Sequence, residues 1–114
     1  MTQSKYVPMR GDIIWIDMSP QSGHEQAGRR PALVLSPEDY NRLTSLALIC
    51  PITSRAKGYP FEVALPQGLA VVGVILSDQL KNVDWRSRSA EFMCKVDHAV
   101  IDATLEKVSN LLTL

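Results

Sequence analysis

The sequence predicts a mainly β fold of the α+β type: a small, mostly antiparallel barrel with one short helix after its second strand and a C-terminal helix. Five or six short runs rich in β-branched and aromatic residues alternate with turn signals. The connections between these runs are too short for crossover helices, which argues against a parallel sheet. With 114 residues, 46% of them apolar, the chain is most simply one domain spanning residues 1–114.

The first strand is expected at residues 13–18, with Trp15 in the core, because this run is β-branched and aromatic and ends at a Ser-Pro pair. The second strand is expected at residues 30–36. Ser36 is then predicted to cap a short helix that has Pro37 at its first position. A third strand follows at residues 46–50, and Pro51 predicts an edge or a bulge at its far end, because proline cannot donate to a ladder.

Further strands are predicted at residues 61–65 and 71–76. Arg86 and Arg88 alternate with serines, a pattern that can place both guanidinium groups on one face. Asp97 is predicted to cap the last helix, whose apolar stripe should pack on the sheet. The stripe consists of Ile101, Leu105, Val108 and Leu112.

Composition sets limits on partners and cofactors. Twelve basic and twelve acidic residues cancel, so any site for a polyanion must be local. Cys50 and Cys94 are too few and too isolated for a disulfide framework or a zinc site, which favours a reducing cytoplasm, no metal and no cofactor. The polar N-terminus and the short apolar run at residues 69–76 indicate neither secretion nor membrane insertion.

A polar loop bracketed by glycines, residues 23–31, leads directly into a predicted buried strand. It holds His24, Glu25, Gln26, Arg29 and Arg30. Loops held by rigid strands often carry catalytic groups, but a solvated hairpin loop explains this stretch equally well.

Cationic residues also gather where other predicted strands end, and planar guanidinium groups suit phosphate oxygens. These residues are Arg55, Lys57, Lys81, Arg86 and Arg88. Four aromatic residues could stack bases, although aromatics in a small barrel more often belong to the core. They are Tyr59, Phe61, Trp85 and Phe92.

The residue types required for phosphodiester cleavage are present. Glu25 can act as a base, Gln26 and Arg30 can donate hydrogen bonds to charged phosphate oxygens, and Thr53 offers an orienting hydroxyl. RNA carries its own nucleophile in the 2′-hydroxyl, so no protein nucleophile is required. A ribonuclease that uses His24 and His98 is conceivable, but both positions read as solvated.

A set of short motifs in order resembles the MazF/PemK family of toxin endoribonucleases. The motifs are Gly11-Asp12-Ile13, Glu25-Gln26-x-Gly28-x-Arg30-Pro31, Leu35-Ser36-Pro37, Pro51-x-Thr53, Lys57-Gly58-Tyr59-Pro60-Phe61-Glu62-Val63, Asp78-Gln79 and Trp85-Arg86-x-Arg88. Each motif is weak alone, whereas the ordered set is specific and covers nearly the whole chain.

The resemblance implies an SH3-like barrel, a homodimer and metal-independent cleavage of single-stranded RNA to 2′,3′-cyclic phosphate and 5′-hydroxyl ends. It also implies a labile MazE-like antitoxin whose extended tail occupies the RNA groove. By position, Arg30 and Thr53 match the family's catalytic pair, and Glu25 matches a carboxylate implicated in some members. The residues expected to contact RNA are Lys57, Gln26, Arg29, Arg86, Arg88 and Gln79.

Two other classes of protein compete with this interpretation. A gyrase-poisoning toxin of the CcdB type resembles the same fold but catalyses nothing. That family relies on a C-terminal Trp-Gly-Ile sequence, whereas this chain ends in Leu-Leu-Thr-Leu. A binding barrel without activity would not need Glu25, Arg30 and Thr53 together.

Overall fold

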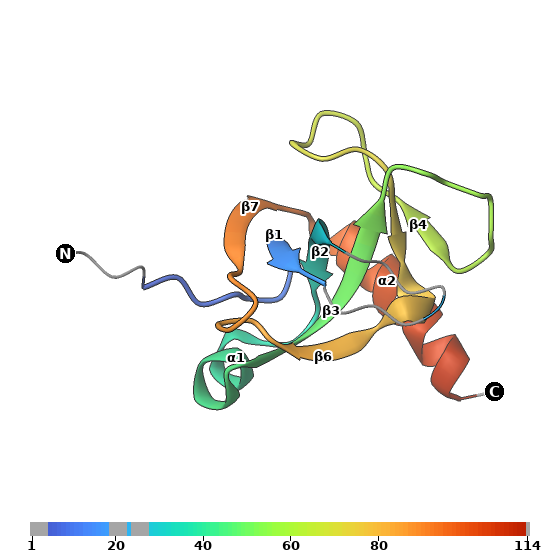
Figure 1. The fold of residues 1–114 in the computed structure, drawn as a ribbon. Helices are drawn as coiled ribbons and strands as arrows, with labels where there is room; N and C mark the ends of the chain where they lie inside the picture. The colour runs from blue at the N-terminus through green and yellow to red at the C-terminus, as the bar shows by residue number, and fades with distance from the viewer. Residues whose placement is uncertain (1–4, 19–22, 24–27, 114) are drawn as a thin grey trace.

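The computed structural model describes residues 5–18, residue 23 and residues 28–113. Their fold is mainly β with two α-helices, as predicted (Figure 1). The elements in chain order are β1 (Asp12–Asp17), β2 (Arg29–Val34), α1 (Glu38–Thr44), β3 (Leu46–Thr53), β4 (Glu62–Ala64), β5 (Val74–Leu76), the 3₁₀ turn η1 (Ser77–Gln79), β6 (Lys81–Asp84), β7 (Glu91–Lys95) and α2 (His98–Leu112).

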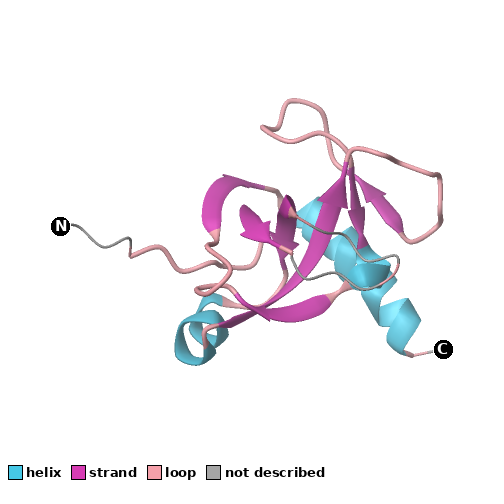
Figure 2. Cartoon of the chain, in the orientation of Figure 1, coloured by secondary structure: helices cyan, strands magenta, loops and turns pink. Residues whose placement is uncertain are grey.

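All strand pairs are antiparallel, and they form one curved sheet in the order β4-β5-β3-β2-β1-β7. The remaining strand, β6, pairs with β3 off this path. The two ends of the path, β4 and β7, do not pair with each other in the described part of the chain, so the predicted barrel is not fully closed. Figure 2 shows α2 on one side of the sheet and the short α1 on the other side of the molecule.

Alternating side chains of the same strands build two apolar clusters. Ile13, Leu33 and Cys50 pack with Ile101 of α2 on one side of the sheet. Ile14, Ala32 and Ile49 belong to the second cluster, which the N-terminal segment helps to cover. Because the period of a strand is two residues, β1, β2 and β3 contribute to both clusters. Neither helix in the described residues is long and apolar enough to cross a membrane.

The prediction that Pro51 marks an edge or a bulge was wrong, because β3 continues through Pro51 to Thr53 within the sheet and keeps a regular register with β2. On one side, β3 pairs with β2. On the other side it pairs with β6 up to Ile49 and with β5 from Ile52 onward. Pro51 lies at this change of partner, where a missing N–H donor is tolerated.

Three local predictions were also wrong. Trp15 is 41% exposed, because it lies on the outward face of β1. The N-cap of α1 is Pro37, which makes no side-chain cap hydrogen bond. The buried face of α2 is formed by Val100, Ile101, Thr104 and Val108, whereas Leu105 and Leu112 are exposed. The cap of α2 by Asp97 is confirmed, since its side chain accepts a hydrogen bond from the Val100 amide.

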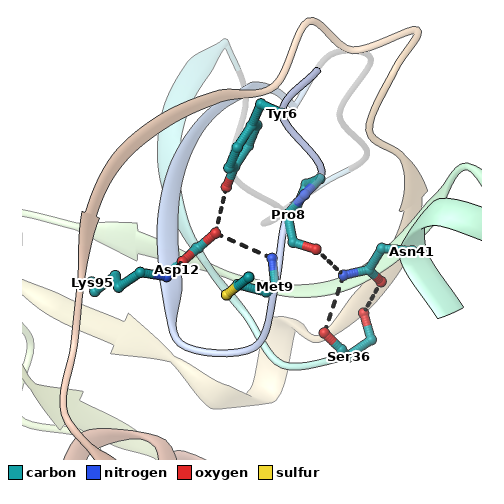
Figure 3. Close-up of polar contacts among 7 residues, drawn as sticks. All are labelled: Tyr6, Pro8, Met9, Asp12, Ser36, Asn41 and Lys95. Atoms are coloured by element: carbon teal, nitrogen blue, oxygen red, sulfur yellow. Dashed lines mark hydrogen bonds and ion pairs between the residues drawn. The ribbon is translucent and has the colours of Figure 1, made fainter. Parts of the chain in front are cut away.

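A buried carboxylate ties the N-terminal segment to the sheet (Figure 3). Asp12 is 1% exposed, and its oxygens accept hydrogen bonds from the Tyr6 hydroxyl at 2.6 Å and the Met9 amide at 3.1 Å. Lys95 Nζ lies 2.6 Å from Asp12 Oδ1 and balances its charge. Burial, and then the hydrogen bond and charge of Asp12, raise the pKa of Tyr6. A buried carboxylate is tolerated when it is paired in this way.

A buried amide forms a second tie between the N-terminal segment and α1. The Asn41 side chain donates to the Pro8 carbonyl at 2.7 Å and to the Ser36 carbonyl at 3.1 Å, and it accepts from Ser36 Oγ at 2.6 Å (Figure 3). The main-chain carbonyl of Asn41 accepts a hydrogen bond from Trp85 Nε1 at 2.9 Å. Asn41 therefore joins the N-terminal segment, the loop after β2 and the loop after β6.

We predict that Asn41→Ala lowers the free energy of unfolding by about 3 kcal/mol, because it leaves buried polar groups around Pro8 and Ser36 without partners. Urea denaturation measures the change. Asn110→Ala, at an exposed position of α2, is the matched control and should have little effect. Equal midpoints for the Asn41 variant and the parent would contradict this account.

Candidate functional site

The strand register brings two of the predicted site residues together. In the β2–β3 pair, Val34 lies opposite Ile49 and Ala32 lies opposite Pro51. Continuing this register by two residues places Arg30 opposite Thr53. Side chains directly opposite each other in an antiparallel pair project from the same face and lie close together. Both residues line the same cleft.

Thr53 is 7% exposed and is the last residue of β3. Its Oγ1 accepts a hydrogen bond from the Arg55 amide at 3.1 Å, which fixes the turn that leaves the strand. Behind it, a Cβ at Gly73 would lie 2.1 Å from the Thr53 carbonyl oxygen, and Gly73 has a φ of +136°. The end of β3 is therefore held against a backbone segment that only glycine can form.

The cleft has a volume of about 700 Å³ and opens between the end of β3 and the segment around η1. The loop between β3 and β4 supplies much of its wall, including Lys57 and the aromatic pair Tyr59 and Phe61, whose ring centroids lie 5.3 Å apart. The lining residues are Arg30, Thr53, Ser54, Arg55, Lys57, Tyr59, Phe61, Glu62, Leu76, Asp78 and Gln79. The cleft therefore combines two aromatic rings with four side chains that carry a positive charge or an amide. The four are Arg30, Arg55, Lys57 and Gln79.

A carboxylate holds the loop that carries Lys57. Glu62 Oε2 accepts from the Lys57 amide at 3.0 Å, and Glu62 Oε1 accepts from the Gly58 amide at 3.1 Å. Gly58 has a φ of +79°, a conformation that favours glycine. At the far end of the loop, Lys107 Nζ of α2 donates to the Pro60 carbonyl.

A second carboxylate borders the cleft at η1. Burial of the carboxyl group and the charge of Glu62 raise the pKa of Asp78, against a hydrogen bond with its own backbone amide that lowers it. Beneath it, burial and then the charge of Asp78 raise the pKa of the Cys50 thiol to about 12. Cys50 therefore stays protonated near neutral pH and is unsuited to act as a nucleophile.

Three predicted RNA-contacting arginines lie outside this cleft. Arg29 directly precedes Arg30 and lies on the opposite face of β2, where it forms an ion pair with Glu91 and donates to the Ser89 carbonyl at 2.9 Å. Residues 85–89, where arginines alternate with serines, form turns. In these turns the Arg86 guanidinium lies 4.4 Å from the centre of the Trp85 ring, and Arg88 donates to the Asp17 carbonyl at 3.1 Å.

The remaining site predictions divide between the cleft and the undescribed loop. Lys57 and Gln79 line the cleft with Arg30 and Thr53. Glu25 and Gln26, like His24, lie outside the described residues.

Among the aromatics, Trp85 is buried and Phe92 packs edge-on against Tyr6 away from the cleft, which leaves Tyr59 and Phe61 as the cleft aromatics. His98 begins α2 and does not line the cleft.

Sequence reasoning did not assign a site role to Glu62, Gly73 or Asp78. A glycine flanked by valines inside an apolar run is a sign of close backbone approach, so Gly73 could have been singled out. Asp78 follows directly after a buried strand, which is a common place for a functional carboxylate. The role of Glu62 depends on a loop conformation that no pattern encodes.

The chain matches the family described as "PemK-like, MazF-like toxin of type II toxin-antitoxin system" over residues 9–112. The Escherichia coli K12 protein named endoribonuclease toxin MazF is 54% identical over 87 residues, which are 76% of this chain and 78% of that protein. A crystal structure of MazF from Deinococcus radiodurans superimposes with a TM-score of 0.94 at 52% identity, covering 96% of this chain and all of that one.

A second structure, of a MazE-MazF complex from Deinococcus radiodurans, has a TM-score of 0.86 at 46% identity and covers 96% of this chain and 99% of that one. The family match spans all seven strands, both helices and the cleft. The fold, the cleft and these similarities agree. The chain belongs to the PemK-like, MazF-like family of toxins of type II toxin-antitoxin systems.

Proposed function

We propose that this protein is an endoribonuclease toxin that cleaves single-stranded RNA at short sequences, without a metal ion, and so inhibits translation and growth. The observation that carries the proposal is the cleft in which Arg30 and Thr53 face the same space as Lys57. In the reaction, the 2′-hydroxyl oxygen of RNA attacks the neighbouring phosphorus, and the bond to the 5′-oxygen breaks. The products are a 2′,3′-cyclic phosphate and a 5′-hydroxyl.

Each cleft side chain has a chemical role in this proposal. Arg30 stabilises the negative charge that develops on the phosphate oxygens, because a guanidinium stays protonated and donates two parallel hydrogen bonds. Thr53 orients the phosphate through its hydroxyl. Lys57 and Gln79 bind the RNA backbone and bases beside them, and Tyr59 and Phe61 offer surfaces on which bases stack.

One carboxylate must accept the proton of the 2′-hydroxyl. Glu25 is one candidate, because it matches a carboxylate implicated in some members of the family. Asp78 is the other candidate, because it lines the cleft. A carboxylate is a better general base near neutral pH when its pKa is raised toward that range. Burial raises the pKa of Asp78 in this direction. We infer that Asp78 accepts the proton, and Glu25 is the alternative.

Membership of the family also supports proposals about partners. We propose a MazE-like antitoxin as the neutralising partner, a homodimer as the active form and the cytoplasm as the site of action. In a dimer, residues of this chain outside the cleft can reach RNA that spans both copies, and this is the role we propose for Arg29, Arg86 and Arg88. Gln26 is proposed to contact RNA as the family resemblance implies. A CcdB-like gyrase poison is not favoured, because the family matched is that of the endoribonuclease relatives.

The test is incubation of the purified protein with a long single-stranded RNA in the presence of EDTA. We expect cleavage at a small set of sequences, and mapping of the 5′ ends gives the recognised sequence. The 5′ ends should accept phosphate from a polynucleotide kinase without prior phosphatase treatment, because they carry hydroxyl groups. Intact RNA at high protein concentration would refute the proposed activity.

We predict that Arg30→Ala lowers the cleavage rate by about 10²–10³, the usual cost of removing one preorganised donor to a developing negative charge. The fold should persist, because Arg30 lies at the end of β2 and outside both apolar clusters. Arg42→Ala is the control, since Arg42 is exposed on α1 and only pairs with Asp39. A parental rate for Arg30→Ala would overturn the assignment.

We predict that kcat/KM falls as the pH is lowered through the pKa of Asp78, because a base must be deprotonated to accept the proton. Since that pKa is raised, the acid limb should lie above the range of an ordinary aspartate, about 3.9. Asp78→Asn should lower the rate by roughly 10²-fold or more and remove this limb. If Glu25→Gln removes the limb and Asp78→Asn keeps it, the base is Glu25.

A further inference from the structure

Glu62 is the first residue of β4, and its side chain points back across the loop that precedes it. Its carboxylate accepts hydrogen bonds from two consecutive amides, those of Lys57 and Gly58, with Lys57 reached by both oxygens at 3.0 and 3.3 Å. The Glu62 amide donates to the Tyr59 carbonyl at 3.1 Å. One residue therefore closes the loop through its main chain and its side chain at once.

The chain around this loop offers little other regular structure to hold it. Residues 55–59 form no helix or strand, and all of them are exposed. A carboxylate that accepts two or three backbone N–H bonds makes strong, charge-assisted interactions, stronger than those of a neutral amide oxygen. The position of Lys57 at the cleft therefore depends on the charge and reach of the Glu62 side chain.

We propose that Glu62 is a positioning residue of the RNA cleft: it sets the place of Lys57 by clamping the Lys57 and Gly58 amides. This inference rests on the proposed ribonuclease function, because Lys57 is given its role there. Glu62 itself does not touch the reacting atoms.

Two substitutions test the clamp. Glu62→Ala removes the acceptors of both amides, and we expect kcat/KM for RNA to fall by roughly tenfold to a hundredfold, the usual effect of misplacing a binding group. Glu62→Gln keeps one acceptor oxygen without the charge, so it should retain more activity than Glu62→Ala. Glu106→Gln, exposed on α2, is the matched control and should leave kcat/KM unchanged.

A double-mutant cycle tests whether Glu62 acts through Lys57. If it does, adding Glu62→Ala to a Lys57→Ala variant should lower kcat/KM little further, because the Lys57 side chain that Glu62 positions is already absent. Losses that multiply in the double variant would contradict the positioning role.

A measurement without RNA keeps this inference separate from the proposed function. Amide hydrogen exchange of Lys57 and Gly58, followed by NMR, should be slow in the parent and faster in Glu62→Ala, with no change at Gly11 or Val96, whose amides bond within the sheet region. Unchanged exchange at Lys57 and Gly58 would overturn the clamp. If the parent protein fails to cleave RNA while exchange behaves as expected, the function falls and the clamp remains.

Discussion

The rest of the structure depends on hydrogen bonding along β3, because this one strand has three antiparallel partners. It pairs with β2 on one side and with β6 and then β5 on the other. The first part of β3 builds the cluster that contains Ile49, and the second part ends at Thr53 in the cleft. A single strand thus links the core to the site, and a displacement of its register would move both.

The two-residue period of strands explains why core and site can share the same elements. Ala32 and Ile49 point into an apolar cluster, while Arg30 and Thr53 continue the same face beyond its edge. The packed interior therefore holds Arg30 and Thr53 in place through the strands on which they lie, whereas Lys57 depends on the Glu62 side chain. A site on the ends of strands is held more firmly than one on a loop alone.

The sequence was sufficient for the parts of the molecule that follow local rules. Asp97 caps α2 as its residue type predicts, and the strands near residues 13–18 and 61–65 are found close to their expected bounds. It failed where tertiary context decides: Trp15 has the composition of a core residue but is 41% exposed, and the buried face of α2 includes Val100 and Thr104 instead of Leu105 and Leu112. For the site, Arg30, Thr53, Lys57 and Gln79 were predicted to act together and do share a cleft, whereas the clamp by Glu62 could not be predicted, since its partners are backbone amides of a loop.

The change of partner at Pro51 separates two sets of strands within the sheet. Strands β1, β2, β3 and β6 pair with one another, whereas β4 and β5 join the ladder through Ile52 and Thr53 of β3. Both sets share the apolar cluster on the α2 side, to which β4 contributes Val63 and β5 contributes Ile75. The exposed residues 54–60 belong to neither the ladder nor this cluster, so exchanges there would reshape the wall of the cleft around Lys57 while the core stays as it is.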